Sequence, residues 1–390
     1  MMPNTAERER QTAAASTGKP SAFRRAARHT LWLLPGLLAL FLLLWLPSHP
    51  SVAEWLCARG LFRVCNTVLS VLTGLLPFSL TELCVTLAVP AAAVLIAAAV
   101  HALRRSSRRG QLLLRLLRGV GWALSCTALL YMLTHGCNFY RYTTAQLMGM
   151  DTAVCTPEYL QAVVTDLAEK ASAARAEVAQ DADGHMVLSR SVPETLADAA
   201  DGYRKLQKTY PFLWGAAYRT KPVTLSHWWS YTGIAGMYFP MLGESNVNTD
   251  QPPCDIPATA AHELAHSRGF AREDECNFYA FLSCSVSDSA DYRYSGYLHA
   301  YVYCANALYG YDTDMWREAR SHLSEDVGRD LAQRSAYWKQ FEGEVQQVST
   351  DINNGFIASQ GDEDGVLSYD RVVELVVGYY RLQGFTGGTP

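Results

Sequence analysis

The sequence has no pair of cysteines at CxxC spacing, and this absence argues against a zinc site built from thiolates. Ten cysteines are present, and the six that follow residue 136 permit disulfides without selecting a pairing. A Gly/Ser-rich linker and an internal repeat are also missing. One compact domain after the apolar first third is therefore the simplest architecture.

Acidic residues are scarce in the first third of the 390-residue chain. Residues 1–136 hold 4 Asp and Glu against 14 Lys and Arg, whereas residues 137–390 hold 33 acidic and 19 basic residues. A basic, apolar part followed by an acidic part is typical of a membrane anchor joined to a domain in water. Because an acidic domain repels phosphate, we expect no nucleic acid as a partner.

Long apolar runs occupy the first third and predict three membrane spans. The runs cover residues 30–47, 83–103 and 111–135. Residues 55–77 are also apolar, but they are interrupted by charged and polar side chains. We interpret residues 55–77 as an interfacial or re-entrant segment rather than a fourth span. The interrupting residues are Arg59, Arg63 and Asn66.

Two basic clusters predict the orientation of the spans. Residues 23–29 (FRRAARH) precede the first run, and residues 104–110 (RRSSRRG) separate the last two. Positive charge favours the cytoplasmic side, and three spans place both clusters there, whereas four would separate them. We therefore expect a protein of the cell membrane, embedded in the lipid bilayer. Residues 1–29 form its cytoplasmic tail, 30–136 its membrane region and 137–390 its extracytoplasmic domain.

The domain after the membrane region is expected to be mainly helical, of α+β class, with a small sheet. Residues 157–182 and 193–210 have helical patterns. Residues 222–248 contain aromatic and β-branched residues among glycines and a proline, which favours short strands and turns. The chain then reads as helical to about residue 350, and residues 364–382 predict a terminal helix entered by a turn.

The segment HELAH, residues 262–266, carries the strongest chemical pattern in the chain. Four residues of helix place His262 and His266 on one face, one turn apart, as two ligands of a tetrahedral zinc ion require. Glu263 could then take a proton from a zinc-bound water that attacks a peptide carbonyl. Asp255 and Pro257 suit the start of such a helix. The alternative is an ordinary surface helix with two unrelated histidines and no metal.

A third ligand would separate these alternatives. Gly269 suits the end of the helix and also fits the pattern HExxHxxGxxH, but Arg272 stands where that pattern has its last histidine. Arginine stays protonated and cannot bind a metal. Glu273 and Glu275 begin the next helical pattern and lie about 200° apart around it, so only one of them can face the metal.

The residues from Glu273 onward resemble the ExxA[DN]xxA pattern of zincins with a glutamate ligand. The resemblance implies Glu273 as the third ligand and Asn277 as the residue that orients a ligand, with Cys276 in the usual alanine position. The three apolar runs together with CNFYR, GIAGMYFPMLGESNVN, HELAHSRGFAREDECNFYAFL and DGVLSY resemble an uncharacterised bacterial family of membrane-anchored, zincin-like proteins known as a domain of unknown function. This resemblance covers roughly residues 30–385 and implies a gluzincin-like fold without a known substrate.

In zincins an edge strand beside the helix pairs with an extended substrate through its backbone. GIAGMYF, residues 233–239, is the candidate strand, and Gly236 would permit close approach of another backbone. Glu244, Asn246 and Asn248 could line the cleft. Alternatively, these three side chains cap backbone groups of a turn.

These patterns predict a zinc-dependent membrane metallopeptidase that acts on a peptide or protein outside the cytoplasm. Alternatives are a non-catalytic sensor or regulatory protein that retains the metal, and a structural membrane protein with a vestigial site. The presence of Glu263 favours the peptidase, because a structural site needs no general base. His227 and His299 are isolated; either could stabilise an oxyanion, although a lone histidine is more often structural.

Overall fold

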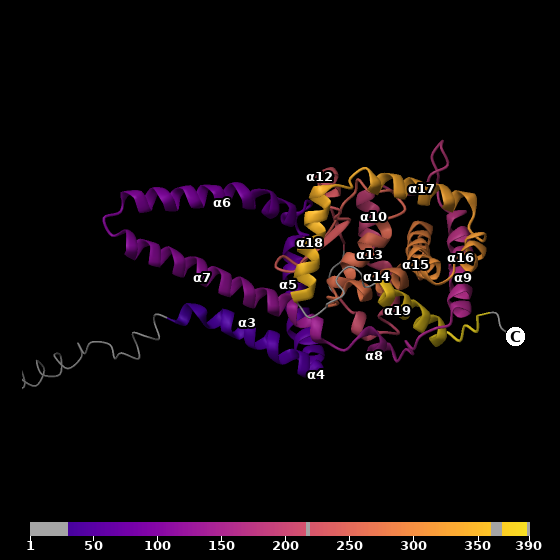
Figure 1. Ribbon diagram of the computed structural model, residues 1–390, viewed down its shortest axis with the longest axis horizontal. Coiled ribbons are helices and arrows are strands. Elements are labelled where there is room, and N and C mark those ends of the chain that lie inside the picture. Colours follow the sequence, from indigo (N-terminus) through magenta and orange to yellow (C-terminus); the bar gives the residue numbers. More distant parts are fainter. Residues whose placement is uncertain (1–29, 216–218, 360–368, 388–390) are drawn as a thin grey trace, which may run out of the picture. The chain divides into compact units, whose positions relative to one another are not determined.

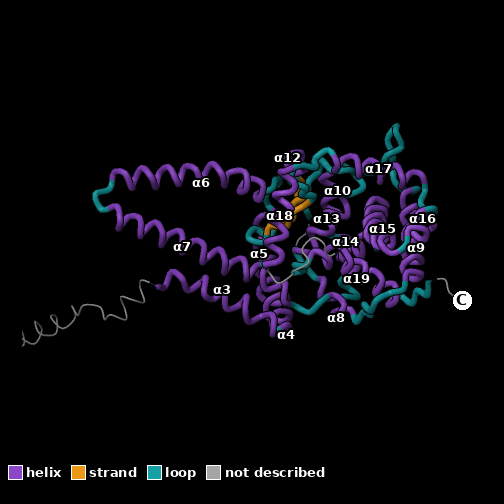
Figure 2. The backbone as a smooth tube through the Cα atoms, in the orientation of Figure 1, coloured by secondary structure: helices purple, strands orange, loops and turns teal. Residues whose placement is uncertain are grey.

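The computed structural model describes residues 30–215, 219–359 and 369–387, which are mostly helical with one small sheet (Figures 1 and 2). The first helical elements are η1 (Leu31–Leu33), α3 (Leu34–Trp45), η2 (Leu46–Ser48), α4 (Pro50–Val52), the π-helical η3 (Ala53–Phe62), α5 (Arg63–Gly74), α6 (Leu80–Arg105) and α7 (Arg109–Thr134). The later ones are η4 (Gly136–Tyr140), α8 (Thr144–Met148), α9 (Pro157–Arg175), α10 (Val192–Asp198), α11 (Asp201–Leu206), η5 (Pro211–Leu213), α12 (Ser226–Ser230), α13 (Ile256–His266), α14 (Glu273–Ser285), α15 (Ala290–Tyr311), α16 (Thr313–Arg320), α17 (Glu325–Lys339), α18 (Glu344–Ser359) and α19 (Tyr369–Leu382). The strands are β1 (Lys221–Pro222), β2 (Gly236–Phe239) and β3 (Glu244–Val247).

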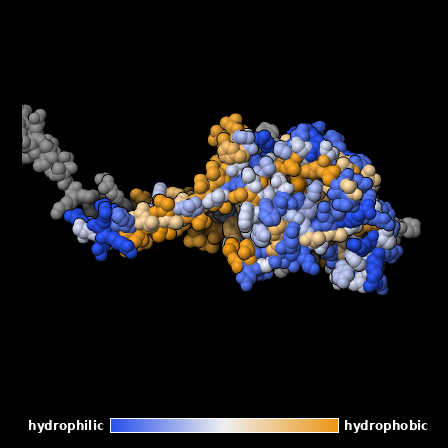
Figure 3. Space-filling model, turned by 90° about the horizontal axis from the view of Figure 1, so that it is seen from above, coloured by the Kyte–Doolittle hydropathy of each residue, from blue (hydrophilic) through white to orange (hydrophobic). Residues whose placement is uncertain are grey.

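The chain divides into two compact units. The first is Met1–Phe41 with Ile96–Leu129, and the second is Leu42–Leu95 with Leu130–Pro390. Within the first unit the connection between α6 and α7 has a hydrophilic surface, while the helices that lead to it are flanked by apolar side chains (Figure 3). This distribution matches helices whose sides face lipid and whose connection faces water.

Four helical stretches are long and apolar enough to cross a membrane: Leu31–Ser48, Pro50–Gly74, Leu80–Arg105 and Arg109–Thr134. Three of them match the predicted spans, and the fourth contains most of the segment predicted to be interfacial. Residues 23–29, the first basic cluster, lie outside the described residues. Length and composition do not distinguish a span from an interfacial helix, so the interfacial assignment of residues 55–77 stays a prediction.

The stretch Pro50–Gly74 is more buried than the other three, and its side chains are hydrogen-bonded to other parts of the second unit. The Asn66 side chain donates to the Ser267 carbonyl over 2.7 Å, and the Ser70 hydroxyl donates to the Gly243 carbonyl over 3.1 Å. These acceptors lie just after α13 and just before β3. The helix α4–η3–α5 is therefore part of the packing around the candidate site.

A buried ion pair makes a second connection from this helix. Glu54 is fully buried, and both of its oxygens accept hydrogen bonds from Arg141, at 2.7 and 2.9 Å. Arg141 also donates to the carbonyl of Gly269 over 2.9 Å and lies over the ring of Phe270. Arg141, which follows α7 in the chain, thus links helix α4–η3–α5 to the end of α13.

The main core lies among α9, α13, α14, α15 and α19. The expected helices are present, with different ends: α9 stops at Arg175, and the segment expected over residues 193–210 is interrupted between α10 and α11. Gly202 in α11 lies directly against the backbone of Ser283 in α14, where a side chain would collide. The terminal helix is present as α19, and the turn predicted before it falls outside the described residues.

The sheet has the strand order β1-β3-β2. β1 runs parallel to β3, and β2 runs antiparallel to it, with Gly236 opposite Val247 and Phe239 opposite Glu244. β2 is an edge strand that packs beside α13, as predicted for residues 233–239. The remainder of residues 222–248 forms turns and the short helix α12.

All ten cysteines lie among the described residues, and each is a free thiol. Cys276 and Cys284 both lie in α14, eight residues apart, and are too distant to bridge each other. The disulfides that the even count permitted are therefore not part of this structure.

Candidate metal centre

Helix α13 places the two motif histidines side by side. It begins at Ile256, with Pro257 in its first turn, and the chain turns after it at Gly269, which has a φ of +85°. The Nε2 atoms of His262 and His266 lie 3.2 Å apart. The sequence spacing therefore directs both imidazoles to the same point, as predicted.

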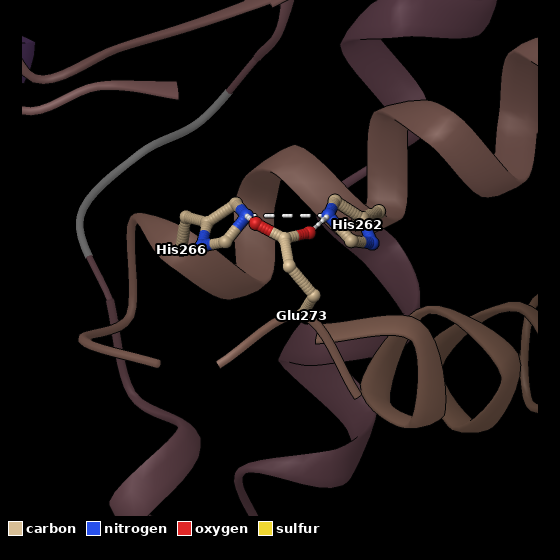
Figure 4. Close-up of side chains that lie close together, drawn as sticks. All are labelled: His262, His266 and Glu273. Atoms are coloured by element: carbon tan, nitrogen blue, oxygen red, sulfur yellow. Dashed lines mark hydrogen bonds and ion pairs between the residues drawn. The ribbon is translucent and has the colours of Figure 1, made fainter. Parts of the chain in front are cut away.

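Glu273, the first residue of α14, brings a carboxylate to this point (Figure 4). Its oxygens lie 3.1 Å from Nε2 of His262 and 3.7 Å from Nε2 of His266. Ligands at 2.0–2.1 Å from a tetrahedral zinc ion lie about 3.3–3.4 Å from one another. The three observed separations bracket that value, so the donors fit a divalent ion in number, type and spacing.

Hydrogen bonds fix the two imidazole rings. Nδ1 of His262 lies 2.8 Å from the side-chain oxygen of Asn277, and Nδ1 of His266 lies 2.9 Å from the carbonyl oxygen of Phe270. Each Nδ1 can donate its proton to that oxygen, which leaves Nε2 unprotonated and able to bind a metal ion. Asn277 therefore contacts the ring of His262, in the position that the resemblance to zincins implied. Cys276 lies 3.3 Å from Nδ1 of His266, on the side of the ring away from the donors.

Glu263 is buried next to the three donors, and its Oε2 atom has no hydrogen-bond partner among the described residues. Burial, followed by the negative charge of Glu273, raises the pKa of Glu263 to about 8. Buried carboxylate oxygens without a partner are rare in native proteins. An orphaned oxygen at this position is expected if a polar group or an ion normally lies in front of it.

Gly236 in β2 lies against Glu263, and a β-carbon there would come within 2.8 Å of the Thr259 side chain. The hydroxyl of Ser245 in β3 donates to the backbone carbonyl of Glu263 over 2.9 Å. The small sheet therefore contacts the helix at the residue expected to act as the base. The absence of a side chain at Gly236 permits this close approach of Glu263, whereas the predicted approach of a substrate backbone stays a prediction.

Glu275, the other candidate at the start of α14, neither faces the donors nor points into solvent. The residue is buried, and its carboxylate accepts a hydrogen bond of 2.6 Å from the backbone N–H of Thr144, at the start of α8. Helix α8 lies 131 positions earlier in the sequence. Helical spacing correctly indicated that only one of the two glutamates faces the site.

Glu244 and Asn246 do not line a cleft beside the donors. Glu244 is buried and accepts from the backbone N–H of Thr81 at 2.7 Å, at the start of α6. Asn246 is also buried and accepts from Ser79 at 2.6 Å. Asn248 donates to Ser230 at 2.9 Å. Their contacts agree with the alternative interpretation, in which these side chains satisfy backbone and loop groups.

The isolated histidines have local partners. His299 lies 2.8 Å from Asp255, and His227 lies 3.0 Å from Asp250. Asp255 was expected to cap α13, but its side chain makes no cap hydrogen bond and instead contacts His299 and Arg334. Neither histidine belongs to the donor group.

One further histidine, which the sequence did not indicate, lies close to the donors. His135 follows directly on α7, and its ring centroid is 5.9 Å from that of His266. It belonged to an apolar run in the sequence, so nothing in the local pattern marked it as a site residue. Its proximity results from contacts between residues more than a hundred positions apart.

A second group of side chains that could bind a metal ion lies in one loop on the surface and consists of Asp181, Asp183 and His185. Asp181 already accepts hydrogen bonds from the backbone N–H groups of Asp183 and His185, each at 2.9 Å. This arrangement stabilises the loop itself.

No curated protein and no solved structure matches the sequence. The model of a family described as a protein of unknown function (DUF3810) matches residues 58–377, so the chain is a member of that family.

Proposed function

We propose that this protein is a membrane-anchored, zinc-dependent metallopeptidase that hydrolyses peptide bonds of an extracytoplasmic substrate. The observation that carries the proposal is the group of two imidazoles and one carboxylate, with the orphaned oxygen of Glu263 beside it. Structural zinc sites usually have four protein ligands, whereas catalytic sites keep one position open. The described residues supply three donors within 4.8 Å of one another, which favours a catalytic site.

His262, His266 and Glu273 would hold the ion. Zinc, when bound, would act as a Lewis acid toward the carbonyl and lower the pKa of a water molecule. Glu263 would take the proton from the attacking water and give it to the leaving amine. Its buried position suits this exchange, because a carboxyl with a pKa raised to about 8 gives up and regains a proton near neutrality. A divalent ion would offset part of that rise.

Strand β2 would hold the substrate. Its one neighbour among the described strands is β3, and Gly236 in β2 lies against the side chain of Glu263. The edge of β2 that is not paired with β3 therefore faces the proposed base. An extended peptide added at this edge would bring one of its carbonyl groups to the donors.

We also propose that the domain after α7 lies outside the cytoplasm. The hydrogen bonds of Asn66 and Ser70 to the loops around α13 and β3 favour an interfacial helix over residues 50–74. With that helix at the interface, residues 31–48, 80–105 and 109–134 cross the membrane. Both basic clusters then lie in the cytoplasm.

The test is the substitution Glu263→Gln in the full-length, detergent-solubilised chain. Glutamine keeps the shape of the side chain but cannot accept the proton. We expect about one zinc per chain in both proteins, and loss of at least about 10²-fold in cleavage of a mixed fluorogenic peptide library by the variant. Zinc is measured by elemental analysis and cleavage by fluorescence.

Glu342→Gln, at an exposed position, serves as the matched control and should leave both quantities unchanged. If both proteins bind zinc and Glu263→Gln cleaves the peptides as fast as the wild type, the proposed mechanism is excluded. Zinc binding without cleavage in either protein would favour the sensor or regulatory alternative. A folded wild type without zinc would exclude the metal site.

A further inference from the structure

The imidazole of His135 is surrounded by aromatic rings on the membrane side of the donor group. Its centroid lies 5.6 Å from Phe139, which it meets edge to face, 6.0 Å from Tyr238 and 5.9 Å from His266. Tyr238 in turn is stacked near His266, with ring planes 18° apart. The packing holds the His135 ring in one orientation beside the proposed ligands.

The ring has unused hydrogen-bonding capacity. Nδ1 of His135 is buried and has no hydrogen-bond partner among the described residues. More than about 90% of buried polar groups in native proteins have a partner. His135 is not one of the three residues whose donor atoms lie within 4.8 Å of one another, so it stands beside the proposed ligand set rather than in it.

Apart from Oε2 of Glu263, which is the acceptor of the proposed base, several polar groups around the donors already have partners. The Tyr238 hydroxyl donates to Asn66 over 2.8 Å, and Nδ1 of His262 and of His266 are held by Asn277 and Phe270. Among the described residues, His135 is thus a side chain next to the donors whose ring retains the capacity to donate a hydrogen bond to a ligand there.

We propose that His135 donates a hydrogen bond from its ring to the carbonyl oxygen bound opposite His262, His266 and Glu273. This inference rests on the proposed function and adds one residue to it. A neutral imidazole always carries one N–H, so the bond requires no change of protonation. A donor aimed at an oxygen that gains negative charge in the transition state contributes on the order of 10²–10³ to kcat.

The position of His135 in the chain has a consequence for the substrate. His135 directly follows Thr134, the last residue of α7. The bound carbonyl is therefore held next to the residue at which the third predicted span ends. Peptides that reach the membrane boundary fit such a site.

The experiment measures ligand binding rather than turnover. Full-length protein in detergent is loaded with Co²⁺ in place of zinc, and acetohydroxamate is titrated while the visible d–d absorption is recorded. This probe binds the metal through two oxygens, one of which is a carbonyl oxygen. His135→Phe keeps an aromatic ring in the pocket and removes the N–H, whereas His135→Gln restores a donor.

We expect wild type and both variants to bind about one cobalt per chain. The acetohydroxamate Kd should rise at least about tenfold in His135→Phe and recover in part in His135→Gln. His227→Ala, which removes a histidine paired with Asp250, is the control and should leave Kd unchanged.

Equal Kd values in wild type and His135→Phe would overturn the inference and leave the metal site intact. Loss of cobalt from His135→Phe would also overturn it, because His135 would then be a ligand or a structural residue. A wild type that binds no cobalt would instead overturn the proposed function, and the inference with it.

Discussion

Carboxylates that look equivalent in the sequence differ in their surroundings in the fold. Glu273 and Glu275 are separated by one residue at the start of α14, yet one lies 3.1 Å from His262 and the other accepts from the N–H of Thr144. Glu263 is buried like Glu275 but has an oxygen without a partner. These environments distinguish a candidate ligand, a structural acceptor and a candidate base.

Exchange of each of the two glutamates in α14 tests that assignment. Glu273→Ala removes one of three donors, so we expect it to lose most of the bound zinc while the fold persists. Glu275→Ala leaves the Thr144 N–H without its acceptor and should destabilise the fold by about 1–3 kcal/mol while zinc is retained. Elemental analysis and thermal unfolding of both full-length variants give the two quantities. Zinc loss from Glu275→Ala alone would reverse the assignment.

Residues whose roles depend on local spacing could be predicted, and those whose partners are distant could not. A helical turn separates His262 from His266, so their shared face follows from the sequence. The placement of Glu273 and Asn277 needed a resemblance to other proteins, because the chain turns between α13 and α14. Glu244 and His135 have their contacts 163 and 131 positions away in sequence, with Thr81 and His266 respectively. No local pattern records such contacts.

Helix α13 is held at both ends by charged side chains from other parts of the chain. At its start, Asp255 contacts His299 in α15 and Arg334 in α17, at 2.8 and 2.7 Å. After its end, Arg141 donates to the carbonyl of Gly269. The sequence predicted where this helix begins and ends, but not what fixes it there. Such fixing matters because the helix carries two of the proposed ligands.

Asp255→Asn should therefore destabilise the whole domain. Burial raises the pKa of Asp255, but Arg334 and His299 outweigh it and lower the pKa to about 2. The carboxylate thus stabilises the fold above about pH 4, and this stabilisation is lost as the pH falls toward 2. At neutral pH we expect a loss of about 2–3 kcal/mol, below the 3–5 kcal/mol of fully buried pairs because Arg334 remains 29% exposed.

Thermal unfolding of the full-length chain measures this loss. The matched control is Asp314→Asn, since Asp314 is 87% exposed and pairs with Arg317 one helical turn away. The control should change stability by no more than about 0.5 kcal/mol. An equal, small shift in both variants would show that Asp255 does not anchor α13.

The apolar helix over residues 50–74 and the chain that follows α7 form a continuous structure in the second unit. Three observations support this: the Asn66–Ser267 hydrogen bond, the buried Glu54–Arg141 pair and the insertion of His135 beside the donors. Hydropathy could divide the chain into an anchor and a domain, because lipid-facing and water-facing residues differ in composition. It could not reveal that the helix over residues 50–74 packs on the site, since those contacts involve a few polar atoms on an apolar segment.

The fragment 137–390 should therefore be unable to form the site alone. It would lack His135, expose the carbonyls of Ser267 and Gly243, and leave the Arg141 side chain, which is 2% exposed, without Glu54. A buried charge that loses its partner destabilises a protein by about 3–5 kcal/mol. We expect less than one zinc per fragment and a lower unfolding temperature than that of the full-length chain. Co-expression of residues 1–136 as a separate chain should restore both, because it supplies the missing contacts. A monomeric fragment that folds cooperatively and holds one zinc would show instead that the anchor only tethers the domain.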